Sequence, residues 1–178
     1  MYRRDMKKTP RSRIGEASNR GEYLIMMPYQ SPCPEYPETD PWYRLLANIQ
    51  KAITGEAGAI QRYTKLLGMA TTEEDKMNLQ KIIGDERKHF AAFQQLYRCL
   101  TGVPPVLGQV PSPTFKTYAE GLKESLYDEL EDAEFYRGIL LSTCDPRVMR
   151  VFYEAQTDEM MHATRFSRLL YLAEEAED

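Results

Sequence analysis

The chain has 178 residues, enough for one domain with a full hydrophobic core. Its net charge of −4 gives no reason to expect nucleic acid as a partner. No stretch approaches 18 consecutive apolar residues, so we expect no membrane-spanning helix and no membrane partner. The three cysteines lie far apart without a C-x-x-C pair, which argues against a sulfur-ligated zinc or iron site and favours a reducing, cytoplasmic location.

The first 40 residues differ in composition from the rest of the chain. Lys and Arg are frequent from position 1 to position 20, and prolines then recur at positions 28, 32, 34, 37 and 41. Proline at such spacing excludes regular helix and favours extended chain. We therefore expect a basic, then proline-rich arm over 1–40, a helical domain over 41–173 and an acidic tail over 174–178.

The first two predicted helices follow the arm. Apolar residues recur every three or four positions from Pro41 to about Met69, which predicts one long amphipathic helix. Threonines at 71 and 72, followed by acidic residues, form a capping signal for the second helix. Gly102 and the prolines after it end that helix.

Two further helices are predicted after a loop of about ten residues. Ser112 and Pro113 are the predicted N-cap and first position of the third helix. Asp145 and Pro146 give the same signal for the fourth helix. The sequence therefore predicts an all-α domain of four helices.

Both histidines of the chain lie in the same short motif. His89 ends the run DERKH and His162 ends the run DEMMH, so both follow the pattern D-E-x-x-H. Positions i and i+3 share one face of a helix. Glu86 with His89, and Glu159 with His162, can therefore each reach one metal ion.

The spacing between the two motifs recurs elsewhere in the chain. The offset that leads from one motif to the other also leads from Glu56 to Glu129, and from Tyr63 to Tyr136. This pattern predicts an internal duplication of one helical hairpin. Within each half, the midpoint between the first glutamate and the motif glutamate falls at the predicted turn. All four glutamates are therefore expected at one height in the middle of the bundle.

We predict a two-metal centre from these residues, which are also the expected catalytic residues. Four buried carboxylates without cations would be costly and would protonate, whereas two divalent ions balance their charge. Oxygen-rich ligands with one imidazole per metal suit iron or manganese, and zinc can bind the same groups. A two-zinc hydrolase, or plain surface glutamates with core histidines, are the alternatives. The predicted ligands are Glu56, Glu86, His89, Glu129, Glu159 and His162.

At these residues the sequence resembles the ferritin-like superfamily, in particular its rubrerythrin and bacterioferritin branch, over about residues 44–172. The resemblance implies a ferritin-like four-helix bundle made of two antiparallel helical hairpins joined by a crossover loop, with two iron ions as cofactor. It also implies that Glu86 and Glu159 bridge both metals. The terminal ligands would then be Glu56 with His89 at one ion, and Glu129 with His162 at the other.

The same resemblance implies roles for residues around the ligands. Asp85 and Asp158 are similar to the aspartates that orient a histidine from across the bundle. Tyr63 and Tyr136 are similar to the phenols that hydrogen-bond a ligand carboxylate, with plain core packing as the alternative. Asp132 stands where rubrerythrins carry an additional glutamate. It is expected to act as an additional metal ligand through water, to admit iron, or to be merely solvated.

The function expected first is ferroxidase chemistry, in which Fe(II) is oxidised by O₂ or H₂O₂ for iron storage or detoxification. An alternative is a rubrerythrin-like peroxidase or oxidase that needs an external electron donor, because the chain has no cysteine pairs for a rubredoxin domain. Another alternative is an iron-binding cargo of a protein shell such as an encapsulin, with the arm as interaction segment. We also expect a homodimer or higher homo-oligomer.

Overall fold

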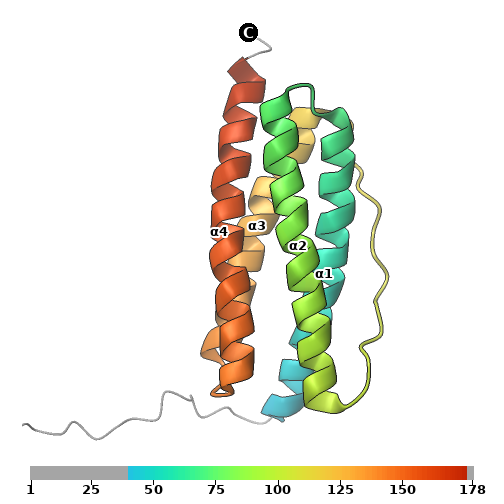
Figure 1. Cartoon of the computed structure of the whole chain (residues 1–178), viewed down its shortest axis with the longest axis vertical. Coiled ribbons are helices and arrows are strands. Elements are labelled where there is room, and N and C mark those ends of the chain that lie inside the picture. The colour runs from blue at the N-terminus through green and yellow to red at the C-terminus, as the bar shows by residue number, and fades with distance from the viewer. Residues whose placement is uncertain (1–39, 176–178) are drawn as a thin grey trace, which may run out of the picture. The chain divides into compact units, whose positions relative to one another are not determined.

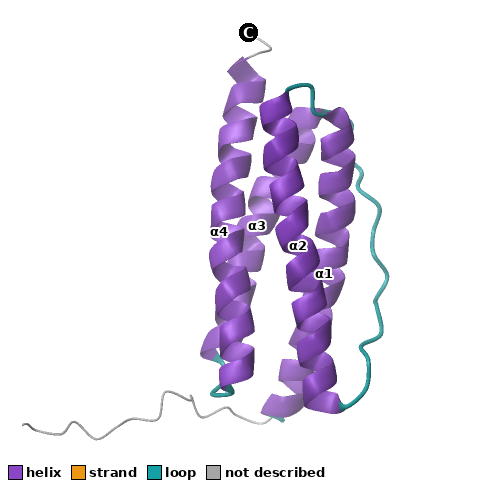
Figure 2. Cartoon of the chain, in the orientation of Figure 1, coloured by secondary structure: helices purple, strands orange, loops and turns teal. Residues whose placement is uncertain are grey.

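The computed structural model describes residues 40–175, which form four helices and no strand. The first 39 residues, and with them almost all of the predicted arm, lie outside the described residues, as do the last three. Figure 1 shows the four helices side by side in one bundle, and Figure 2 shows the long loop between the second and third helices. The helices are α1 (Pro41–Met69), α2 (Glu73–Thr101), α3 (Tyr118–Leu141) and α4 (Pro146–Glu175).

The bundle consists of two hairpins. α1 packs most extensively on α2, and α3 on α4, while α1 also contacts α3 and α2 also contacts α4. Short turns at 70–72 and 142–145 join the helices within each hairpin. These turns lie at the midpoints that the positions of the glutamates predict, so the predicted duplicated hairpins joined by a crossover are confirmed.

Local capping contacts explain most of the helix ends. The side chain of Asp40 accepts a hydrogen bond from the first turn of α1, where Pro41 occupies a position that needs no donor. Thr72 caps α2 in the same way, and Gly102 ends α2 with a φ of 78°, in the left-handed region. Asp145 accepts a hydrogen bond of 2.8 Å from the backbone of the first turn of α4. These ends agree with the sequence prediction.

The start of α3 differs from the prediction. The predicted start at Ser112 and Pro113 is wrong, because α3 begins at Tyr118. Thr117 and Glu120 form a reciprocal capping box there, in which each side chain accepts a hydrogen bond from the backbone at the other residue. The loop before α3 is therefore longer than the sequence predicts.

Tertiary contacts hold this loop in an extended course along α1. The Lys65 ammonium donates hydrogen bonds to the carbonyls of Pro113, at 3.2 Å, and Phe115, at 2.5 Å. Lys65 also lies over the ring of Phe115, which is only 3% exposed. Gln50 of α1 donates to the carbonyl of Val106. These contacts hold the loop in an extended course against α1, so α3 begins at Tyr118 and not at the earlier signal.

The far end of α4 also differs from the expected boundary. The inward stripe of this helix includes Phe152, Phe166 and Leu169, all buried. The helix continues through Glu174 and Glu175, past the predicted domain end at 173.

The core has two hydrophobic clusters, one on each side of the bundle centre along its length. One cluster contains Tyr63, Leu79 and Phe166, and the other contains Ile49 and Phe152 among its members. The four glutamates at 56, 86, 129 and 159 lie between these clusters along their helices. A band of buried charge therefore divides an otherwise apolar core.

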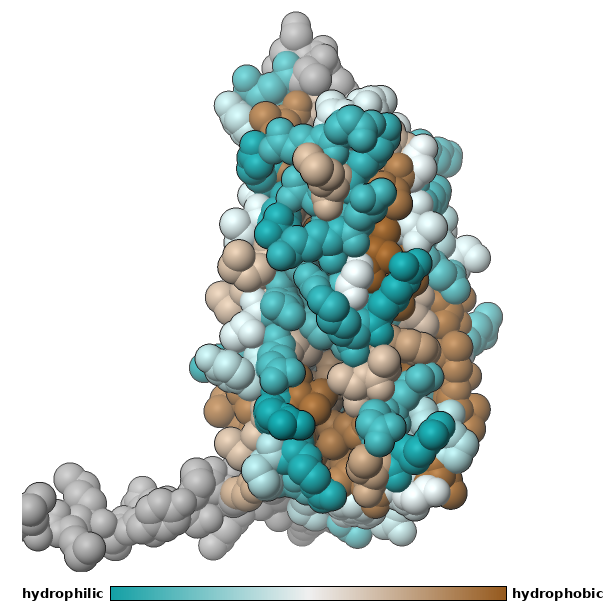
Figure 3. All heavy atoms as spheres, in the orientation of Figure 1, coloured by the Kyte–Doolittle hydropathy of each residue, from teal (hydrophilic) through white to brown (hydrophobic). Residues whose placement is uncertain are grey.

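The outside of the bundle is mixed in polarity. Figure 3 shows hydrophilic residues over much of one face, with apolar patches between them. Exposed apolar residues of α4 include Met149, Tyr153 and Met160. Single exposed apolar residues are ordinary on protein surfaces, so this pattern does not blur the division between core and exterior. Among the described residues, no helix is both long and apolar enough to cross a lipid bilayer.

Candidate metal centre

All six predicted ligand residues are buried and meet in the middle of the bundle. α1 and α3 each provide one glutamate, and α2 and α4 each provide a glutamate and a histidine. Their exposed fractions lie between 1% and 6%. Every helix of the bundle therefore contributes to one enclosed cluster: Glu56, Glu86, His89, Glu129, Glu159 and His162.

The six side chains form two groups of four that share two members. One group, here called the Glu56 position, contains Glu56, Glu86, His89 and Glu159. The other, here called the Glu129 position, contains Glu86, Glu129, Glu159 and His162. In each group one ligand atom per residue lies within 4.8 Å of all the others. Glu86 and Glu159 thus lie where a bridging carboxylate would be needed, while their binding of metal stays a prediction.

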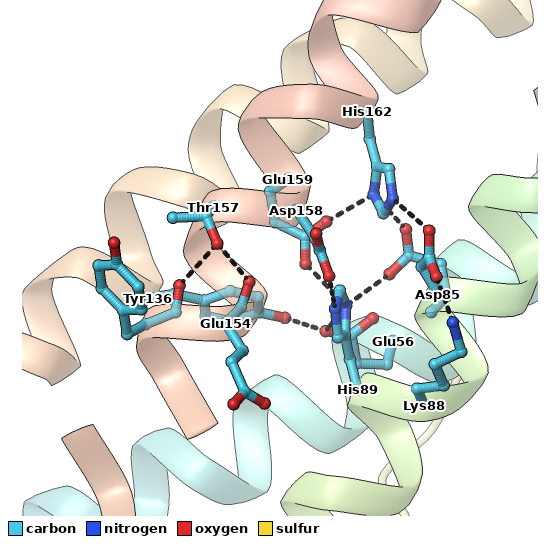
Figure 4. Close-up of polar contacts among 12 residues, drawn as sticks. Glu56, Asp85, Lys88, His89, Tyr136, Glu154, Thr157, Asp158, Glu159 and His162 are labelled. Carbon is cyan, nitrogen blue, oxygen red and sulfur yellow. Dashed lines mark hydrogen bonds and ion pairs between the residues drawn. The ribbon is translucent and has the colours of Figure 1, made fainter. Parts of the chain in front are cut away.

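Each histidine points Nδ1 into the cluster. Nδ1 of His89 lies 3.2 Å from Oε1 of Glu159, and Nδ1 of His162 lies 2.8 Å from Oε2 of the same glutamate. Figure 4 shows both rings between carboxylates of different helices. Nδ1 is therefore the ring nitrogen available to a metal ion.

The other ring nitrogen of each histidine faces an aspartate of the opposite motif. Nε2 of His89 lies 3.2 Å from Oδ2 of Asp158, and Nε2 of His162 lies 3.6 Å from Oδ2 of Asp85. An aspartate at Nε2 fixes the ring orientation and leaves Nδ1 for the metal. Each aspartate thus faces a histidine of the opposite motif, within hydrogen-bonding distance for His89 only, and their orienting role stays a prediction.

Each of the two tyrosines lies against a glutamate of the opposite hairpin, and these glutamates are the two predicted to be terminal ligands. The Tyr136 hydroxyl donates a hydrogen bond of 2.5 Å to Oε1 of Glu56. Burial raises the pKa of Tyr63 well above its usual value, and the nearby charge of Glu129 raises it further. Tyr63 therefore lies beside Glu129 as Tyr136 lies beside Glu56, in keeping with the duplication.

Asp132 belongs to neither group of four. It lines a pocket of about 250 Å³ between α1 and α3, together with Lys51, Arg62 and Phe135. Burial raises the pKa of Asp132 to about 7, and the negative charge of Glu159 adds to this shift. The structure therefore places Asp132 between the surface pocket and the cluster, outside the set of ligand atoms.

The metal-free cluster has unbalanced charge. Burial raises the pKa of Glu56 well above its usual value, and the charge of Glu86 adds to the shift. Burial likewise raises the pKa of Glu129, against the opposing hydrogen bond of His162. Two of the four carboxylates thus hold protons more readily than an exposed glutamate does.

Protons on the two histidines balance the remaining negative charge of the carboxylates. Burial would lower the pKa of His89, but the neighbouring carboxylates of Glu159 and Glu86 raise it to about 10. Burial also opposes the shift at His162, whose pKa is nevertheless raised by the carboxylates around it, chiefly that of Glu129. For Glu86, burial would raise the pKa, but the two neighbouring imidazoles lower it to about 2. Metal ions would take the place of these protons.

Buried oxygens without a well-aligned hydrogen bond indicate that the residues fit a metal. Oε1 of Glu86, Glu129 and Glu159 are buried and have no hydrogen bond of good geometry, although Nδ1 of His89 lies 3.2 Å from Oε1 of Glu159. Nδ1 of His162 lies 2.9 Å from Oε1 of Glu86, but not in hydrogen-bonding alignment. Buried polar atoms normally have a partner, and carboxylate oxygens beside imidazole nitrogens are the donors that iron and manganese prefer. Two divalent cations would satisfy both the oxygens and the charge.

Aromatic rings pack on both sides of the cluster along the bundle. The rings of Phe93 and Phe152 stack with centroids 4.7 Å apart, and Tyr136 meets Phe93 edge-on at 5.2 Å. On the other side Tyr63 packs on Phe166 at 4.9 Å. These rings exclude water along the bundle axis, so the electrostatic interactions of the centre act in a low-dielectric environment.

One contact near the centre was missing from the sequence prediction. Lys88 donates a hydrogen bond of 2.7 Å to Oδ1 of Asp85 and forms an ion pair with it. The i, i+3 spacing of the two residues was a usable signal for this pair. Its importance depends on the approach of Asp85 to His162, which only the tertiary structure shows.

Comparisons with known proteins agree with this architecture. The chain matches the Rubrerythrin family model over residues 47–170, a range that contains the whole cluster. It is 35% identical over 133 residues to the uncharacterized protein YhjR of Bacillus subtilis (strain 168), and the match covers 73% of this chain and 88% of that protein.

Solved structures share the fold. The bacterioferritin-related protein from Bacteroides fragilis, described as a dodecameric thioferritin, superposes with a TM-score of 0.66 at 18% identity, over 78% of this chain and 90% of that one. A hypothetical protein from Pyrococcus furiosus gives a TM-score of 0.65 at 21% identity, over 72% and 89%. At these identities the likeness shows the ferritin-like four-helix fold alone. Together with the match over residues 47–170, it shows that the chain belongs to the rubrerythrin family.

Proposed function

We propose that this protein is a ferroxidase that oxidises Fe(II) to Fe(III) with O₂ or H₂O₂ for iron storage or detoxification. The family and the buried cluster together indicate a di-iron protein. The observation that carries the proposal is the pair of four-residue groups that share Glu86 and Glu159. Such an arrangement suits two cations that act as a unit.

The residues of the cluster would hold the ions, and bound iron would supply the redox chemistry. Glu86 and Glu159 would lie between the two positions. Asp158 keeps the ring of His89 oriented with Nδ1 inward, and the Tyr136 hydroxyl holds the outer carboxylate of the Glu56 position. Each of these contacts fixes a ligand before metal arrives, which lowers the reorganisation that binding requires.

The reaction also requires protons. Two Fe(II) substrates give two electrons to one O₂, which takes up two protons and forms H₂O₂. Asp132, with a pKa raised by burial to about 7, lies next to the cluster and lines a surface pocket. Its carboxyl can hold or release a proton near neutral pH, which makes it a candidate to pass protons between solvent and the cluster.

The proposal is tested by loading the metal-free chain with Fe(II) under anaerobic conditions and then adding O₂. Oxidation should saturate at about two iron ions per chain. Glu86→Ala should abolish it, because this residue belongs to both positions. The control Glu131→Ala removes an exposed carboxylate from α3 and should leave the oxidation unchanged. Absence of oxidation in the native chain, or full activity in Glu86→Ala, would rule out this function.

A second candidate is a rubrerythrin-like peroxidase or oxidase, which the family match favours. The sequence contains no C-x-x-C pair, so the electrons would come from a separate donor protein. Turnover of H₂O₂ and O₂ should be compared in the presence of an external reductant. Repeated turnover with H₂O₂ at constant iron content would favour the peroxidase over the ferroxidase.

Partners and location remain proposals as well. We propose a cytoplasmic homo-oligomer, with association with a shell protein such as an encapsulin as one further role. The segment suggested for shell binding lies outside the described residues. Deletion of residues 1–39 should abolish co-purification with a co-expressed shell protein and leave iron oxidation intact. Loss of oxidation in the deleted chain would contradict this division of roles.

A further inference from the structure

The two metal positions differ in the surroundings of their histidines. The duplication pairs Lys88 with Met161, so only one of the two D-E-x-x-H motifs carries a lysine. Nζ of Lys88 donates to Oδ1 of Asp85 at 2.7 Å, while Oδ2 of the same carboxylate lies 3.6 Å from Nε2 of His162. Figure 4 shows Asp85 between the imidazole and the ammonium.

Asp158, the matching aspartate of the second motif, is not shared between a histidine and a lysine. Oδ2 of Asp158 lies 3.2 Å from Nε2 of His89, within hydrogen-bonding distance. Within residues 40–175, no lysine or arginine forms an ion pair with Asp158, although the charge of Lys88 acts on it at longer range. His89 therefore faces a carboxylate that no lysine or arginine of the described residues pairs with, whereas His162 faces a carboxylate that Lys88 already engages.

This difference acts on the metal through the imidazole ring. A carboxylate that accepts a hydrogen bond from the outer ring nitrogen makes the inner nitrogen a stronger ligand and fixes its direction. The separation of 3.6 Å between Asp85 and His162 is too long for such a hydrogen bond. The ammonium on the same carboxylate also offsets part of its negative charge, so the carboxylate polarises the imidazole ring less.

We propose that Lys88 makes the two metal positions unequal. By forming an ion pair with Asp85, Lys88 weakens the interaction between this aspartate and the imidazole of His162. The Glu129 position therefore binds a divalent ion less tightly than the Glu56 position. The inference rests on the proposed function only in that it requires two metal positions.

Asp132 is a second difference between the two halves of the chain, but it does not distinguish the two metal positions. Asp132 has no acidic counterpart in the first half, since the duplication pairs it with Ala59. Its charge acts on Glu86 and Glu159, which both positions share. A change at Lys88, by contrast, acts mainly through His162, because Lys88 forms its ion pair with Asp85 and its charge reaches Asp158 only at longer range. It should therefore alter one binding step more than the other.

The test titrates the metal-free full-length chain with Co(II) and follows its visible absorption. The native chain should bind two ions in two resolved steps. Lys88→Met should tighten the weaker step by about three- to tenfold and change the tighter step by less than about twofold. Loss of such a partner outright typically changes affinity about 10–100-fold. Lys88 is 77% exposed at its side chain, so the substitution leaves the core intact.

The duplication supplies a reciprocal variant and a matched control. Met161→Lys places an ammonium three residues after Asp158 at an exposed position, and it should weaken the tighter step. Arg87→Met removes the same charge next to Lys88, at an exposed residue with no ion pair in the described part of the chain. This control should leave both steps unchanged.

The outcomes separate the inference from the proposed function. Two equal steps in the native chain, or equal effects of Lys88→Met and Arg87→Met, would overturn the inference. Fewer than two Co(II) ions per native chain would instead contradict the two-metal function. Anomalous scattering from crystals with one equivalent of Co(II) gives an independent answer without any variant. The Glu56 position should fill first, and prior filling of the Glu129 position would refute the inference.

Discussion

The hydroxyl of Tyr136 on α3 donates a hydrogen bond of 2.5 Å to Oε1 of Glu56 on α1, and so links the two hairpins through the centre of the bundle. The tyrosine is 1% exposed and the glutamate 2%. Because neither group can reach water, the carboxylate oxygen would lose its hydrogen bond without the phenol and keep only a longer contact of 3.9 Å with Nδ1 of His89.

Tyr136→Phe should therefore destabilise the metal-free protein by about 1–3 kcal/mol, the usual consequence of removing the hydrogen-bond donor of a buried polar atom. Urea unfolding at constant pH measures the change. Tyr153→Phe, at an exposed tyrosine of α4, is the matched control and should have little effect. Equal stability of the two variants would show that the hydrogen bond contributes nothing.

Shared and terminal ligands should differ in metal stoichiometry. Glu86→Ala removes a ligand from both positions and should reduce tightly bound Zn(II) to well below one ion per chain. Glu56→Ala leaves the Glu129 position complete and should retain about one ion. Metal analysis after gel filtration measures both. Retention of a full complement by Glu86→Ala would contradict a shared position for this residue.

Metal binding should release protons. In the metal-free protein, the pKa of His89 is raised to about 10 by its carboxylate neighbours against the effect of burial, so the ring holds a proton at pH 7. Burial also raises the pKa of Glu56. An incoming ion displaces these protons, so affinity should increase as pH rises towards 10. Calorimetry in buffers with different ionisation enthalpies measures the number released; identical heats in all buffers would contradict it.

Gly121 lies where a side chain has no room. A Cβ there would lie 2.6 Å from Leu66 and 2.7 Å from the ring of Phe115, which anchors the crossover loop. Gly121→Ala should therefore destabilise the protein by about 1–3 kcal/mol. Gly138→Ala, on the exposed side of α3 with nothing within 4 Å, should instead stabilise it by up to about 1 kcal/mol. Thermal unfolding of both variants shows which effect dominates at Gly121. A lower melting temperature for Gly121→Ala indicates close packing, and a higher one indicates helix propensity.

Asp132 should make the metal-free protein less stable as pH rises. Burial raises its pKa from 3.8 to about 7, so between these values the unfolded chain has lost a proton that the folded chain keeps. Its contribution is fully present below about pH 4, is lost progressively as pH rises, and is gone above about pH 7. Asp132→Asn should remove this slope and gain roughly 1–4 kcal/mol over the native chain at pH 8. An unchanged slope in the variant would assign the pH dependence to other groups.

Local chemistry explains what the sequence by itself determined. The starts of α1, α2 and α4 and the end of α2 depend on a proline, a capping side chain or a left-handed glycine next to the helix, so short-range signals suffice to locate them. The repeat of D-E-x-x-H at the spacing that also pairs Glu56 with Glu129, with the turns midway between paired glutamates, was enough to predict a duplicated hairpin and a cluster at one height. Helical periodicity turns these spacings into positions.

Contacts between residues far apart in the chain decided the rest. Lys65 holds the carbonyls of the crossover loop, so α3 begins at Tyr118 and not at the earlier proline signal. The unequal support of the two histidines arises because Asp85 reaches both Lys88 and His162, a distance relationship across the bundle. Spacing predicts which face of a helix a residue occupies, but the separation of two side chains on different helices depends on how those helices pack, and only the tertiary structure determines that.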